Sequence, residues 1–268
     1  MVKNERYCVT KGFSDQDITI TENPDECDLP SGSGNQGGTG NNGSTGKTLA
    51  TLATTSTEVT SVPSCVTDGS ECAVGTAIAI QVNESEVYNF YVLKEENNEV
   101  TLIMDRNLGD NVEWINASDY GEENTDETSC SYTSCNDEGP VTALNALNER
   151  TSGWRNISEK TYTVSGLGQN GTTRKYEDIE YTGRVRILTY EEATDASIGC
   201  TTSSRSCPEW LYKNLYYNGD NNIYGYWTTT PVAGYTHIAW FVYYYGNVNI
   251  DNVYRTYYGL RPVIELSK

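Results

Sequence analysis

The chain has 268 residues and a mass of 29.7 kDa, which is enough for one large domain or for one domain with short additions. Its 18 Lys and Arg residues against 37 Asp and Glu residues give a formal net charge of −19, which argues against binding to nucleic acid or to anionic membranes. The sequence has no apolar run of the roughly 20 residues that cross a bilayer, and its first residues lack a signal-peptide core.

The single histidine, His237, excludes a metal site built from several histidines. A Ser-His-Asp or Cys-His catalytic site would have to use this one residue. We therefore expect no enzyme activity, no cofactor and no bound metal. Tyrosine is unusually frequent, with 21 Tyr against 3 Phe. Because tyrosine joins a large apolar ring to a polar hydroxyl, it suits contact surfaces that are partly exposed to water.

The 8 cysteines are close neighbours in pairs, namely Cys8 with Cys27, Cys65 with Cys72, Cys130 with Cys135, and Cys200 with Cys207. Pairing of neighbours into disulfides is the simplest hypothesis, although the sequence leaves the connectivity open. The spacings are wider than the C-x2-C knuckles of zinc sites. Disulfides persist in oxidising compartments, so we expect an extracellular or cell-surface protein whose export segment has been removed.

The N-terminal part divides at the change in composition. Residues 1–29 form a short segment with one cysteine pair, too small for a core of its own. Residues 30–63 are rich in Gly, Ser, Thr and Asn, which predicts a flexible linker before a domain over residues 64–268. Within the linker, GNNGSTGKT resembles a phosphate-binding loop, but its glycine spacing is wrong and no strand precedes it, so we reject nucleotide binding.

From residue 64 onward the apolar pattern predicts regular elements. TAIAIQV (76–82) predicts a strand, and residues 87–108 predict a hairpin that turns at Glu96-Asn97-Asn98. GPVTALNALNER (139–150) places Val141, Leu144 and Leu147 at helical spacing, with Thr142 as the expected N-cap.

The segment RVRILTYEEATDASIG (184–199) predicts the tip of a strand followed by a short helix capped near Thr189. The last residues are strand-like and end in GLRPVIELSK. Two short helices among many strands, with little alternation of strand and helix, predict the α+β class with a small antiparallel sheet and long loops.

Several polar groups receive a structural interpretation. We expect Asp105, Arg106 and Arg261 to form a structural ion pair between terminal strands. The neighbouring carboxylates of Glu122-Glu123 and Glu191-Glu192 would point to different helix faces, which indicates solvated charge. The NGDNN motif (218–222) lacks the glycine and the glutamate of a calcium loop. Two aromatic residues are expected in the core, Trp210 and Trp227.

Residues 235–258, YTHIAWFVYYYGNVNIDNVYRTYY, are the most distinctive segment, because they hold 7 of the 21 tyrosines. Trp240 and Val242 alternate with Phe241 and Tyr243, which predicts a strand with one apolar and one aromatic-polar face. Clustered Tyr with interspersed Asn and Arg is also typical of antibody binding surfaces. The alternative is a tyrosine-rich strand ladder that packs against its own domain.

The frame YWTTTP followed by AWFVYYYGNVNIDNVYRTYYGLRPVIEL resembles the variable region of proteins diversified by diversity-generating retroelements. Together with MDRNLG, GPVTALNALN and RVRILTYEEA, the resemblance covers residues 65–268. It implies a C-type lectin-like domain of the formylglycine-generating-enzyme type. In that family, rewriting of template adenines cannot produce Lys, Glu, Gln, Met or Trp. Residues 235–258 contain none of the first four, and the one forbidden residue is Trp240, which the frame would hold as an invariant anchor. The EPN, QPD and WND tripeptides of calcium-dependent lectins are absent, so no such sugar binding is expected.

The resemblance divides the segment into scaffold and contact positions. It implies scaffold roles for Trp240, Val242, Gly246, Val248, Val253, Gly259, Arg261 and Pro262. The implied ligand contacts are Phe241, Tyr243, Tyr244, Tyr245, Asn247, Asn249, Ile250, Asp251, Asn252, Tyr254, Arg255, Thr256, Tyr257 and Tyr258, with Tyr235 and His237 as an extension.

The sequence thus predicts a monomeric, non-catalytic binding protein of the adhesin or receptor type, displayed on a surface. Its unknown macromolecular ligand is expected to be a protein rather than a glycan, bound at the tyrosine-rich C-terminal face. The alternative is a pilin-like or surface-layer subunit that uses residues 241–258 for self-assembly. An enzyme on the same fold would require a metal or a reactive cysteine.

Overall fold

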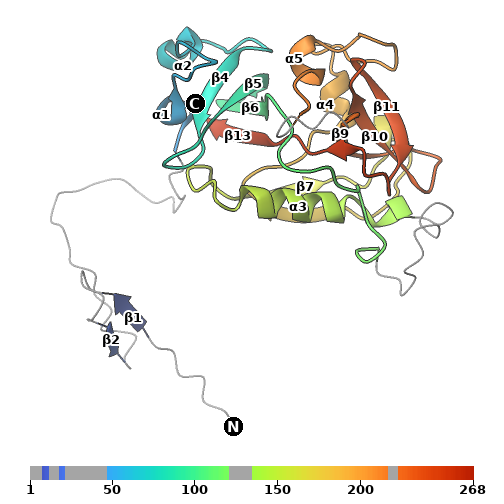
Figure 1. The fold of residues 1–268 in the computed structure, drawn as a ribbon, viewed down its shortest axis with the longest axis horizontal. Coiled ribbons are helices and arrows are strands. Elements are labelled where there is room, and N and C mark those ends of the chain that lie inside the picture. The colour runs from blue at the N-terminus through green and yellow to red at the C-terminus, as the bar shows by residue number, and fades with distance from the viewer. Residues whose placement is uncertain (1–7, 12–17, 22–46, 121–134, 217–222) are drawn as a thin grey trace. The chain divides into compact units, whose positions relative to one another are not determined.

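The computed structural model describes residues 8–11, 18–21, 47–120, 135–216 and 223–268. The chain divides into two compact units, Met1–Ser44 and Thr45–Lys268. In the first unit, β1 (Cys8–Lys11) and β2 (Ile18–Thr21) pair in an antiparallel ladder. The second unit holds the other described elements (Figure 1).

The second unit begins earlier than the sequence predicts. α1 (Leu49–Leu52) and β3 (Ala53–Thr54) fall inside the expected linker, and the side chains of Leu49 and Leu52 are buried in the core. Residues 47–63 therefore belong to the domain, because a short apolar segment, LATL, repays the entropy of its ordering. The remainder of the expected linker, residues 30–46, lies outside the described residues.

The first sheet of this unit has five antiparallel strands in the order β13-β6-β5-β4-β3. Its longer strands are β4 (Ala77–Gln81), β5 (Val87–Glu96), β6 (Glu99–Met104) and β13 (Val263–Ser267). Asn97 and Asn98 join β5 to β6 with φ angles of 52° and 63°. Because asparagine tolerates this left-handed backbone, the pair makes a tight turn, and the predicted hairpin is confirmed.

The second sheet has four strands in the order β11-β10-β9-β12, and β12 is parallel to β9. The strands are β9 (Gly225–Pro231), β10 (Ile238–Tyr243), β11 (Asn247–Asn252) and β12 (Tyr258–Gly259). A separate hairpin joins β7 (Lys160–Val164) to β8 (Ile179–Gly183). In Figure 1 the two larger sheets lie side by side, with α3 and β7 running beneath them.

The helices are short, and α3 is the longest of those described. Besides α1, they are α2 (Ser64–Asp68), α3 (Val141–Thr151), α4 (Tyr190–Thr194) and α5 (Glu209–Tyr212), with 3-10 turns η3 (Cys135–Glu138) and η4 (Gln169–Gly171). The structure is of mixed α+β class with mostly antiparallel strands, as expected. No helix in the described part of the chain is long and apolar enough to cross a membrane.

Of the two predicted N-caps, that of α4 is confirmed and that of α3 is wrong. Thr189 caps α4 through a reciprocal capping box with Glu192, as the sequence predicts. α3 also forms, and Leu144 and Leu147 are buried while Val141 is half-buried. Thr142 is not its N-cap, because Pro140 occupies that position. The Thr142 hydroxyl instead accepts from the Asn116 N–H and donates to Asp119, at 2.8 and 2.6 Å.

Two disulfides lie within the described residues, Cys65–Cys72 and Cys200–Cys207, as the neighbour pairing predicts. The other two predicted pairs, Cys8–Cys27 and Cys130–Cys135, fall on side chains outside the described residues. So do Glu122-Glu123 and the NGDNN motif. Of the tryptophans expected in the core, Trp227 is fully buried and Trp210 is partly buried.

Arg261 does not join the ion pair predicted for it. Asp105 pairs with Arg106 at 2.7 Å, but the guanidinium of Arg261 is fully buried and faces backbone oxygens. It lies 4.6 Å from the centre of the Tyr226 ring. It also donates to four carbonyl oxygens after and within α5, those of Trp210, Leu211, Lys213 and Asn214. Arg261 thereby fixes the end of α5 against the second sheet.

Candidate functional site

The scaffold positions implied by the resemblance are all buried: Trp240, Val242, Gly246, Val248, Val253, Gly259, Arg261 and Pro262. β10 is the second strand of its sheet, with β9 on one side and β11 on the other. Trp240 and Val242 enter one hydrophobic cluster, whereas Phe241 enters the other. Both faces of β10 are therefore packed, which differs from the predicted strand with one outward face.

The predicted contact residues separate by exposure into three groups. Exposed side chains belong to Tyr235, Tyr244, Tyr245, Asn249, Ile250, Thr256 and Tyr257. Half-buried side chains belong to His237, Tyr243, Asp251, Asn252, Tyr254 and Arg255. Three predicted contacts are buried and do not face solvent: Phe241, Asn247 and Tyr258.

The burial of these three residues has specific causes. The Phe241 ring centre lies 4.1 Å from that of Tyr258 and 6.0 Å from that of Trp227, so the three rings form a packed cluster. The Tyr258 hydroxyl donates to the Asp251 carboxylate at 2.6 Å. The Asn247 side-chain amide donates to the Thr202 carbonyl oxygen at 3.2 Å, so it holds a neighbouring loop. These three residues are therefore packed beneath the exposed side chains of residues 235–258.

Five tyrosines form a connected group at one end of the second sheet, which we call the tyrosine surface: Tyr224, Tyr243, Tyr244, Tyr245 and Tyr257. Ring centres lie 4.1 Å apart for Tyr244 and Tyr245, and 5.2 Å apart for Tyr243 and Tyr245. Tyr224 lies 5.8 Å from Tyr244 and 5.5 Å from Tyr257. Four of the five are exposed, by 36 to 54 %, and Tyr243 is half-buried between them and Phe241.

Tyr224 escapes the sequence analysis because it lies outside residues 235–258. Backbone pairing brings it into the group: its N–H donates to the Tyr257 carbonyl, and its carbonyl accepts from the Tyr244 N–H, both at 2.9 Å. The adjacent Gly225 permits this close approach, since a Cβ there would overlap the Val242 carbonyl oxygen. The dipeptide Tyr224-Gly225 before a strand is the only local signal.

Arg255 borders the tyrosine surface. Its guanidinium lies 5.3 Å from the ring centre of Tyr254 and 5.9 Å from that of Tyr257, within cation–π range. Asp251 lies 3.7 Å from it. Burial, and then the hydrogen bond to Asp251, raises the pKa of Tyr258, so that hydroxyl stays protonated. The surface thus offers ring faces, tyrosine hydroxyls and the guanidinium of Arg255.

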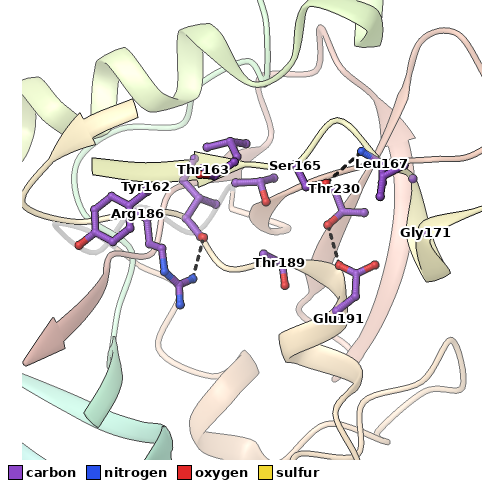
Figure 2. A pocket seen from close by; sticks show the side chains of 13 residues that line it. Tyr162, Thr163, Ser165, Leu167, Gly171, Arg186, Thr189, Glu191 and Thr230 are labelled. Atoms are coloured by element: carbon purple, nitrogen blue, oxygen red, sulfur yellow. Dashed lines mark hydrogen bonds between the residues drawn. The ribbon is translucent and has the colours of Figure 1, made fainter. Parts of the chain in front are cut away.

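A separate pocket of about 290 Å³ lies between β7, η4, α4 and β9 (Figure 2). Threonine and serine hydroxyls and apolar side chains line it, with Arg186 at one end and Glu191 at the other. The Thr230 hydroxyl donates to Glu191 at 3.2 Å and accepts from the Tyr190 N–H at 3.0 Å. Within the described residues, no group of three His, Cys, Asp or Glu could hold a metal ion.

Glu192, interpreted from sequence as solvated charge, is instead only 16 % exposed and ion-paired. Its carboxylate accepts two bonds from Arg186, at 2.5 and 2.8 Å, while Arg186 also binds Glu265 at 2.7 Å. Glu191 is exposed, as expected. Because the charged and hydroxyl groups beside the pocket bind one another, they stabilise the fold and leave little for a substrate.

Comparisons of the chain with protein-family models, with curated proteins and with solved structures find no match. The tyrosine surface and the pocket between β7, η4, α4 and β9 are two features of the described residues on which a function can be based. The tyrosine surface exposes its polar and aromatic groups to solvent, whereas the charged and hydroxyl groups beside the pocket bind one another. The tyrosine surface is the better candidate.

Proposed function

We propose that this chain is a non-catalytic binding protein that contacts a protein ligand through the tyrosine surface. The observation that carries the proposal is the connected group of four exposed tyrosine rings. These rings lie at the ends of strands, and the packed second sheet holds the strands in place. Rings held in this way offer large contact area at low cost in conformational entropy, and their hydroxyls supply hydrogen bonds.

The proposal includes a C-type lectin-like fold and diversification by a retroelement. All the scaffold positions of residues 240–262 are buried, whereas six of the intervening side chains are exposed: Tyr244, Tyr245, Asn249, Ile250, Thr256 and Tyr257. This difference supports the proposal, because exposed positions accept substitution without loss of the core. Sequencing the flanks of the gene tests it directly. We expect a near-copy of the segment encoding residues 235–258 that differs only at adenines, beside a reverse transcriptase gene.

The proposed location is extracellular or at the cell surface. The disulfides Cys65–Cys72 and Cys200–Cys207 support it, because such bonds persist in oxidising compartments. We expect the protein to be recovered from intact cells after labelling of surface amines with a reagent that does not enter them.

Binding can be tested with a phage-displayed library of random peptides as the probe. The wild-type chain should enrich specific peptides, and replacement of Tyr244, Tyr245 and Tyr257 by Ser should weaken their binding by about 100-fold. A matched control replaces Val74 and Val87, which are also exposed apolar residues but lie beside the other sheet. Enriched peptides that bind the triple variant as well as the wild type would contradict the proposal.

The alternative function, a structural subunit, is distinguished from ligand binding by the oligomeric state of the chain in solution. An aromatic surface of this kind also fits a second copy of the chain, which would bury the same rings. Light scattering of the wild type should give the monomer mass. Concentration-dependent assembly that the triple tyrosine variant abolishes would favour the subunit over the ligand-binding protein.

A further inference from the structure

The loop closed by the Cys200–Cys207 disulfide lies directly beside the tyrosine surface. The Arg205 N–H donates to the Tyr245 carbonyl oxygen, and the Cys207 N–H donates to the Gly246 carbonyl oxygen, both at 2.9 Å. The Val248 N–H in turn donates to the Thr201 carbonyl oxygen at 3.0 Å. Residues 201–207 therefore follow the turn between β10 and β11 along its whole length.

Side chains and the disulfide add to this attachment. The buried Asn247 amide donates to the Thr202 carbonyl oxygen at 3.2 Å, and the Ser206 hydroxyl accepts from the Thr201 N–H at 2.7 Å across the loop. The sulfur atoms of Cys200 and Cys207 close the loop at its base and are buried. The loop is thus attached to β11 and to the turn before it by hydrogen bonds and is closed by a disulfide, although it has no regular structure.

Arg205 is the residue of this loop that calls for an explanation. Its φ angle is 60°, a left-handed backbone that favours glycine or asparagine, and its side chain is exposed. It occupies the third position of the turn closed by the Ser206 N–H and the Ser203 carbonyl oxygen at 3.3 Å. Backbone strain of this kind accumulates where a side chain is retained for binding.

The charge of Arg205 is also unbalanced. The sequence has 37 carboxylates, yet within the described part of the chain none lies within ion-pair distance of this guanidinium. By contrast, Arg255, the other arginine at the tyrosine surface, has Asp251 at 3.7 Å. An exposed arginine whose backbone binds that of Tyr245 presents a bidentate site for a carboxylate next to an aromatic contact area.

We infer that residues 201–206 form a second part of the ligand-binding surface and that Arg205 binds a carboxylate of the ligand. The ligand is a protein segment with an aspartate or glutamate side chain next to an apolar or aromatic residue that packs on Tyr245. The net charge of −19 repels such a segment at long range. At physiological salt, however, charges more than about 8 Å apart are largely screened, so the short-range contact with Arg205 determines whether the segment binds. The inference rests on the proposed function.

The experiment uses the phage-displayed random peptide library and the whole chain. Peptides enriched on the wild type should be rich in Asp and Glu. Replacement of Arg205 by Ser should lower their affinity by about tenfold, as expected for the loss of one charge-assisted pair. Arg155→Ser removes the same charge from an exposed position after α3 and should leave binding unchanged. Methyl esterification of the peptide carboxylates should weaken binding to the wild type and leave binding to Arg205→Ser unaltered.

The outcomes separate this inference from the function on which it rests. Peptides that depend on Tyr244, Tyr245 and Tyr257 but bind Arg205→Ser as tightly as the wild type would overturn the inference and leave the proposed function standing. Failure to enrich any peptide, or enrichment that ignores the tyrosines, would overturn both. Retention of the wild-type melting temperature by Arg205→Ser excludes unfolding as the cause of lost binding.

Discussion

Tyr224 and Tyr257 lie 33 positions apart in sequence, yet the Tyr224 N–H donates to the Tyr257 carbonyl oxygen at 2.9 Å and their ring centres are 5.5 Å apart. This pairing precedes the parallel contact of β12 with β9, in which Tyr258 faces Gly225. The chain thereby returns to the start of β9 after β10 and β11. The tyrosine surface is thus a product of strand order, and its rings come from segments that only the sheet brings together.

Gly225 is expected to be essential for this arrangement. A Cβ at this position would overlap the Val242 carbonyl oxygen, which is backbone and cannot move without separating β9 from β10. Gly225→Ala should therefore lower the free energy of unfolding by about 3 kcal/mol. Gly153→Ala, where the added methyl meets no atom within 4 Å, should be nearly neutral in the same urea titration. Equal urea midpoints for the two variants would contradict this packing of Gly225 against Val242.

The two described disulfides offer a matched comparison, since each closes a loop with a sequence separation of 7. Replacing both cysteines of either pair by Ser should cost about 2 kcal/mol of stability, because the unfolded chain regains loop entropy. Only loss of Cys200–Cys207 should also weaken peptide binding, because only that loop borders Tyr245. Surface plasmon resonance with a selected peptide checks the difference, and equal binding losses would argue against a role for the loop.

Arg205→Gly should stabilise the protein while it weakens binding. Glycine removes the steric cost of a left-handed residue, about 1–2 kcal/mol, and adds about 0.5–1 kcal/mol of entropy cost on folding. The net expectation is a gain of about 0.5 kcal/mol, seen as a higher urea midpoint. A gain in stability together with a loss of peptide binding would show that Arg205 serves binding rather than stability. A destabilised Arg205→Gly variant would show that the arginine side chain supports the fold.

Glu192 should make stability depend on acid pH. Burial tends to raise its pKa, but the ion pair with Arg186 and the N–H of Thr189 bring the pKa below its ordinary value. A lowered pKa in the folded state gives stability that is complete at neutral pH and is lost as the pH falls below about 4.5, through the lowered value.

Glu192→Gln tests this dependence. At pH 7 the variant should lose about 3 kcal/mol, because Arg186 loses a buried partner, and the difference from wild type should shrink towards pH 3. Urea midpoints measured between pH 3 and pH 7 give both curves. Glu84→Gln, at an exposed position, should follow the wild type throughout. A constant difference between Glu192→Gln and wild type across this range would contradict the assignment.

Local features of this protein could be predicted from the sequence because neighbours along the chain determine them. Asn97-Asn98 selects the turn of the β5–β6 hairpin, and Thr189 with Glu192 begins α4. Cysteines seven positions apart, such as Cys200 and Cys207, close their own loops. The burial of Trp240, Val242, Val248 and Val253 follows from their apolar side chains.

What only the tertiary structure decided is which aromatic side chains reach solvent. Phe241 and Tyr258 share the sequence pattern of the exposed tyrosines, but packing on Trp227 buries them. Tyr224 lies outside the pattern and is exposed within the group. Strand order and register set these positions, through contacts between residues distant in sequence, so the spacing of residues along one segment does not contain them.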